Sequence, residues 1–63
     1  MSTERATTLA DEIYRAMQGM TWRAAEELMD TRSSDIRYIH DHEPSRVDHL
    51  RNLIGYMRAR EQD

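Results

Sequence analysis

Residues 19–39 read GMTWRAAEELMDTRSSDIRYI, and the order of apolar and polar residues in them indicates a helical fold. An apolar face around the alanine pair at 24–25 predicts a short helix that another helix can approach closely. Five polar residues at 30–34 follow, and they are rich in side chains that form caps and turns. Ile36 and Ile39 then stand three residues apart, which places both on one face of a second helix. The stretch therefore predicts two helices joined by a polar turn.

Helical spacing of apolar residues continues on both sides of this stretch. A four-four-three spacing before it predicts a helix over about residues 8–18, carried by Leu9, Ile13, Met17 and Met20. A three-four-three spacing after it predicts a last helix over about residues 46–60, carried by Val47, Leu50, Ile54 and Met57. We therefore expect an all-α fold, a compact bundle of about four short helices that forms a single domain over residues 1–63.

Cap residues give the expected ends of these helices. Thr8 and Ser45 each precede an aspartate by three residues, a spacing similar to that of a capping box, so we expect them to start the first and last helices. Thr21 is the expected cap of the second helix, and Gly19 before it offers a left-handed stop to the first. Pro44 ends the third helix, because proline disfavours a helical residue before it.

The length and composition of the chain exclude several classes of protein. A chain of 63 residues forms one domain at most, and without cysteine it has neither a disulfide nor a thiolate metal site. No apolar run reaches the ~20 residues of a membrane span and no signal sequence is visible, so we expect a soluble, cytoplasmic protein with no membrane contact. A helical chain this short offers no cleft for a catalytic triad. We therefore expect neither an enzyme nor a cofactor.

Histidine and aspartate side chains gather near the end of the third helix. His40, Asp41 and His42 are consecutive, Asp48 and His49 follow, and both residue types can bind zinc. Residues one or two apart do not face each other on a helix, however. We expect no metal site and interpret these histidines as solvated.

The first half of the stretch quoted above resembles a known family. Residues 19–28, GMTWRAAEEL, are similar to the start of the helix-turn-helix unit in Cro/repressor-type (XRE-like) regulators and related small antitoxins, which commonly read Gly-Leu-Thr-Gln-x-x-Ala-Ala-x-x-Leu. Residues 31–39 look like the recognition helix of that family, and residues 43–50 look like the loop into its fourth helix. The resemblance covers about residues 9–57 and places the helix-turn-helix unit at about 21–41. The polar turn is one residue longer than the turn in that family.

This resemblance implies a sequence-specific DNA-binding transcriptional regulator of the small helix-turn-helix type. The helix at about 32–41 would enter the major groove of double-stranded DNA, which admits one α-helix. The residues expected to contact bases are Arg32, Ser33, Ser34 and Arg37. The residues expected to contact phosphates are Thr21, Arg23, Ser45 and Arg46. Proteins of this type double their site by two-fold symmetry, so we expect a homodimer whose contacts include Tyr56 and Met57, on the exposed flank of the last helix, and Trp22.

A second interpretation uses the acidic character of the same region. The net charge is −3, and residues 21–44 contain six acidic side chains, which disfavours a strong phosphate footprint. Arg32 and Arg37 would then pair with Asp35 and Asp41 on a solvated face. The alternative function is a small helical protein-binding module, an antitoxin-like or phage-type inhibitor with a protein partner and no DNA contact.

Overall fold

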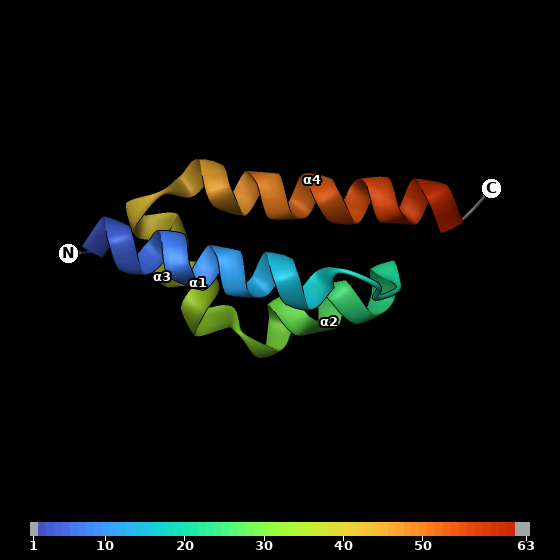
Figure 1. Ribbon diagram of the computed structural model, residues 1–63, viewed down its shortest axis with the longest axis horizontal. Coiled ribbons are helices and arrows are strands. Elements are labelled where there is room, and N and C mark those ends of the chain that lie inside the picture. The colour runs from blue at the N-terminus through green and yellow to red at the C-terminus, as the bar shows by residue number, and fades with distance from the viewer. Residues whose placement is uncertain (1, 62–63) are drawn as a thin grey trace.

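The computed structural model describes residues 2–61 and is built from helices alone over that range (Figure 1). Residues 1, 62 and 63 of the expected domain lie outside the described residues. The four helices are α1 (Ser2–Met17), α2 (Trp22–Thr31), α3 (Ser33–His42) and α4 (Pro44–Glu61). The expected all-α bundle is therefore confirmed.

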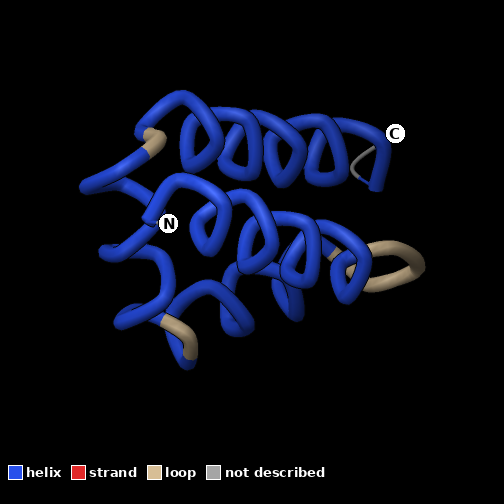
Figure 2. The backbone as a smooth tube through the Cα atoms, turned by 60° about the vertical axis from the view of Figure 1, so that its left-hand side comes forward, coloured by secondary structure: helices blue, strands red, loops and turns tan. Residues whose placement is uncertain are grey.

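The two long helices, α1 and α4, lie side by side and run in the same direction (Figure 1). Contacts at two levels of α1 agree with this arrangement, because Thr7 reaches Glu43 before α4 while Tyr14, further along α1, stacks on His49 within α4. After α1 the chain turns back through α2, and α3 crosses the end at which α1 and α4 begin (Figures 1 and 2). The molecule is consequently elongated, with principal extents of 41 × 19 × 15 Å.

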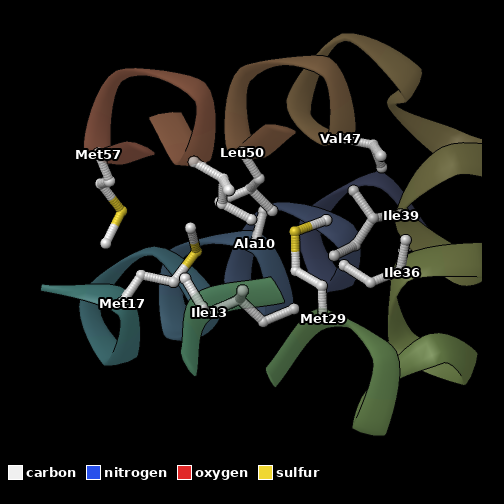
Figure 3. Packing of buried hydrophobic residues seen from close by; sticks show 11 residues of the cluster. Ala10, Ile13, Met17, Met29, Ile36, Ile39, Val47, Leu50 and Met57 are labelled. Carbon is white, nitrogen blue, oxygen red and sulfur yellow. The ribbon is translucent and has the colours of Figure 1, made fainter. Parts of the chain in front are cut away.

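One apolar core is shared by all the helices (Figure 3). The stripes expected from the sequence converge in it, and no polar or charged side chain among the described residues is buried. The buried side chains are those of Ala6, Ala10, Ile13, Met17, Ala25, Met29, Ile36, Ile39, Val47, Leu50, Ile54 and Met57. Each helix is therefore oriented by the apolar face that it contributes to the same cluster.

Two helices begin earlier than their expected caps. Helix α1 begins at Ser2 rather than near residue 8, because Ala6 is fully buried and extends the apolar stripe by one turn. Thr8 is therefore not a cap, and its hydroxyl donates to the carbonyl oxygen of Glu4 at 3.0 Å. Helix α4 begins at Pro44, since proline is favoured at the first helical position, and Ser45 consequently lies inside the first turn.

The expected five-residue turn between α2 and α3 is wrong. A single residue, Arg32, connects the two helices, with φ −106° and ψ 33°. The turn formers at 30–31 continue α2 and those at 33–34 open α3, so that Met29 and Ile36 both reach the core. The Arg32 side chain holds the connection by an ion pair of 2.9 Å with Asp35.

The start of α2 is as the sequence predicts. The Thr21 hydroxyl accepts a hydrogen bond from the amide of Ala24 at 3.2 Å, which satisfies one free donor at the helix start. Gly19 has φ +84°, the left-handed conformation that glycine adopts without a steric penalty. These two residues reverse the chain between α1 and α2.

The two glycines of the chain should respond oppositely to substitution by alanine. Gly55 lies within α4 and a Cβ there meets open space, so Gly55→Ala should raise the free energy of unfolding by up to about 1 kcal/mol. Gly19→Ala should lower it by about 1 kcal/mol, because φ +84° is strained for alanine. Chemical denaturation monitored by circular dichroism measures both changes. Equal signs for the two variants would contradict the described turn or the described helix.

Candidate functional site

Helix α3 lies at one end of the molecule (Figure 1), and the side chains on its outer face are polar. Its inner face carries Ile36 and Ile39 into the core, as the sequence predicts. Its outer face carries Ser33, Ser34 and Arg37, all of which are exposed. The structure thus brings these three expected base-contacting residues onto one helix with free surface.

The two arginines expected to contact bases differ in their surroundings. Arg32 is half-buried, and both its Nε and its terminal amine lie 2.9 Å from Oδ2 of Asp35. Arg37 is exposed and makes no ion pair with any residue between 2 and 61. Its guanidinium keeps all five N–H donors available to a ligand. Arg37, and not Arg32, is therefore the free cation of this face.

Thr21 and Arg23 lie at the opposite end of α2 from α3. Both are exposed, and the Thr21 hydroxyl is already used as the helix cap. The guanidinium of Arg23 lies 5.1 Å from the centre of the Trp22 ring, and Arg58 of α4 lies 4.8 Å from the same ring. Trp22 is half-buried beneath these cations, which cover part of its surface.

A carboxylate from α4 is bound at the start of α2. The backbone amide of Trp22 donates to Oε2 of Glu61 at 2.8 Å. This contact joins residues 39 apart in the chain, and nothing in their local spacing predicts it. It ties the last turn of α4 to the positive end of the α2 dipole.

Ser45 and Arg46 lie in the first turn of α4, beside a network that the sequence does not reveal. Ser45 is exposed, but Nε of Arg46 is held 2.6 Å from Oε2 of Glu43. The hydroxyl of Thr7 in α1 donates to the same oxygen at 2.7 Å. The Thr7 hydrogen bond, aided by Arg46, holds the pKa of Glu43 below its ordinary value of 4.5, although partial burial acts in the opposite direction.

A groove lies where α2, the start of α3 and α4 meet. Its volume is about 530 Å³, and its floor consists of Met29, Ile36 and Ile54. Two carboxylates of α2, from Glu26 and Asp30, and one guanidinium of α4, from Arg51, also line it. The α2 wall of this groove, which faces Ser33 at the start of α3, is therefore acidic.

Tyr56 and Met57, both expected in a dimer contact, differ in their exposure to solvent. Tyr56 is 72% exposed, the most of any large hydrophobic side chain among the described residues. Met57 is only 9% exposed and packs in the core, so the expectation that it lies on the exposed flank of the last helix is wrong. Position 57 faces the core because it continues the stripe of Leu50 and Ile54.

Two of the three histidines make ring contacts. His42 packs against Tyr38 with ring centres 4.4 Å apart, and His49 stacks on Tyr14 at 6.0 Å. Across residues 2–61, the side chains of histidine, aspartate and glutamate form no group of three or more that could hold a metal ion. None of the helices over these residues has both the length and the apolar character needed to cross a bilayer.

Comparison with known proteins adds no relative. No family model, no curated protein and no solved structure matches this chain.

Glu43→Gln should lower the melting temperature at neutral pH, because it removes the ion pair with Arg46 and weakens the bond from Thr7. The folded-state pKa of Glu43 is depressed, so its contribution to stability is present above pH 4.5 and is lost as the pH falls through the folded pKa. The difference between Glu43→Gln and the parent should consequently shrink in acid. Glu12→Gln, at an exposed position, is the matched control and should change little. A difference that stays constant from neutral to acid pH would contradict this role.

Proposed function

We propose that the chain binds double-stranded DNA sequence-specifically as a small transcriptional regulator, with α3 in the major groove. The observation that carries the proposal is the amphipathic placement of α3, with Ile36 and Ile39 in the core and Ser34 and Arg37 exposed at one end of the molecule. A helix held by one face and polar on the other can enter the major groove, where base edges present distinct donors and acceptors. The resemblance of residues 19–28 to helix-turn-helix regulators supports the same function.

Within this proposal the expected contact residues take different roles. Arg37 contacts a base, because an unpaired guanidinium can donate two hydrogen bonds to O6 and N7 of guanine. Arg32 holds the connection between α2 and α3 through Asp35, and reaching a base would cost this ion pair. Ser33 and Ser34 supply hydroxyls at the start of the helix. The flanking phosphate contacts fall to Thr21, Arg23, Ser45 and Arg46.

The charge of the molecule restricts how it would bind DNA. The net charge is −3, and the carboxylates of Glu26 and Asp30 lie beside Ser33. Few phosphates can be neutralised by such a surface, so non-specific affinity should be weak and the salt dependence shallow. Discrimination between sites then depends on base contacts such as that of Arg37.

A second candidate function, binding of a protein partner, is supported by a different feature of the structure. The groove between α2 and α4 has an apolar floor and two carboxylates on its α2 wall, Glu26 and Asp30. This combination suits an amphipathic segment with basic residues, as a small protein-binding module would require. Such a module would bind its partner without any contact from Arg37.

Selection from a random pool of duplexes at low salt, followed by fluorescence anisotropy on the enriched sequence, tests the DNA proposal. Arg37→Ala should weaken binding to that sequence by about 1–3 kcal/mol, which is about fivefold or more, because a bidentate base contact is lost. The matched control is Arg15→Ala, which removes an arginine of α1 that is also exposed and makes no ion pair within residues 2–61. Its effect should be small.

Two results would contradict the DNA proposal. One is a selection in which no sequence is enriched, which would favour the protein-binding module. The other is an equal loss of affinity for Arg37→Ala and Arg15→Ala, since that would reflect net charge rather than a base contact. The circular dichroism spectra of both variants should match that of the parent, because both positions are exposed.

A further inference from the structure

The seam between the parallel helices α1 and α4 contains two hollows. One of about 440 Å³ lies near the start of α4 and is lined by residues that include Tyr14 and His49. The other, of about 270 Å³, lies towards the end of α4 and is lined by residues that include Leu53 and Arg60. Both are lined only by α1 with its following turn and by α4 with the residue before it. We refer to this surface as the α1–α4 seam.

Two large hydrophobic side chains are exposed among the described residues, and they belong to the two helices that form the seam. Tyr14 is 41% exposed, lines the first hollow and stacks on His49. Tyr56 is 72% exposed on α4, and seven residues, two helical turns, separate it from His49. A separation of seven residues places Tyr56 on the same side of α4 as His49. Tyr56 lines neither hollow, but it stands beside the seam at a different level from Tyr14.

Charges at the two ends of the seam are opposite and unmatched. Asp11 lines the first hollow and Arg60 lines the second, and neither has an ion-pair partner within residues 2–61. The other charges along the seam are already engaged, since Arg46 pairs with Glu43 and Glu61 binds the amide of Trp22. Asp11 and Arg60 are too far apart on one chain to pair with each other.

Measured along the helix axis, these groups lie at matching distances on opposite sides of Leu53. With a rise of 1.5 Å per residue, Arg60 lies about 10 Å beyond Leu53 along α4. Asp11 lies about 10 Å before Leu53, because it precedes Tyr14 by three residues and the stacked His49 precedes Leu53 by four. By the same rise per residue, Tyr56 lies about 4–5 Å beyond Leu53, on the side of Arg60. The Tyr14–His49 pair lies about 6 Å before Leu53, on the side of Asp11.

We propose that a second copy of this chain docks on the α1–α4 seam, related to the first by a two-fold axis that passes beside Leu53. The axis brings Asp11 of each copy to the partner's Arg60, and Tyr56 of each copy to the partner's Tyr14 and His49. Each contact occurs twice, as an isologous interface requires. No residue of α3 lines the seam, so the dimer leaves Ser34 and Arg37 free, and the interface does not depend on DNA binding.

Sedimentation equilibrium of the full chain without DNA tests this dimer. The parent mass should rise above 7.5 kDa towards twice that value as the concentration is raised from micromolar to millimolar. Asp11→Arg and Arg60→Asp should each weaken the dimer about tenfold or more, because each places like charges together twice. The double variant Asp11→Arg with Arg60→Asp has the net charge of the parent and should recover its dissociation constant to within a few-fold.

Glu12→Arg is the matched control, because it makes the same charge change beside Asp11 at an exposed position that does not line the seam. It should leave the dissociation constant unchanged, and circular dichroism should show that every variant keeps its helices. A parent that stays at 7.5 kDa over the whole range would overturn the proposal. A double variant that fails to recover, or a Glu12→Arg variant as weak as Asp11→Arg, would overturn it equally.

Discussion

A single small core must hold all four helices of the described residues, and the direction of every exposed face follows from this requirement. A chain of 63 residues without cysteine has no disulfide to add stability, so each helix is oriented by the apolar stripe that it can bury. For α3 this leaves little freedom. Met29 and Ile36 stand on either side of the single connecting residue Arg32, and both must reach the core. The polar face of α3 is consequently turned outward by the packing of its other face.

Because the core is small, carboxylates at its edge also join distant segments of the chain by hydrogen bonds. Glu43 accepts hydrogen bonds from Thr7 and Arg46 where α1 meets the start of α4. Glu61 accepts the amide of Trp22 where the end of α4 meets the start of α2. Neither carboxylate is deeply buried, so each adds direction to the packing without a large desolvation cost. With both ends of α4 held in this way, the helix lies parallel to α1 and the α1–α4 seam extends along the molecule.

The apolar stripes and the helix count could be predicted from the sequence, because a period of three to four residues identifies which face is buried. Local capping signals were less reliable. Thr8 and Ser45 have the spacing of caps, but burial of Ala6 and the preference of Pro44 for the first helical position move both helix starts. Of the candidate site residues, the exposure of Ser34 and Arg37 follows from the positions of Ile36 and Ile39.

Contacts between distant residues could not be predicted from the spacing of side chains. The pair Arg46–Glu43 has a helical spacing that sequence can suggest, whereas the bond from Thr7 to Glu43 joins residues 36 apart and depends on the parallel packing of α1 and α4. The α1–α4 seam likewise depends on the packing of two helices that are distant in the sequence. Asp11 and Arg60 belong to one surface only after the chain has folded. That they have no ion-pair partner follows from the structure, which gives the ion pairs of residues 2–61.

The central claim is that the outer face of α3 and the α1–α4 seam are separate binding surfaces, one for DNA and one for a second copy of the chain. Amide chemical shifts measured by NMR are its sharpest test. Adding a selected duplex should shift the amides of Ser33, Ser34 and Arg37 on α3. Diluting the chain without DNA should instead shift the amides around Tyr14, Leu53 and Tyr56 on the α1–α4 seam. Shifts confined to one common set of residues in both titrations, or the absence of shifts on α3 with DNA, would contradict the separation of the two faces.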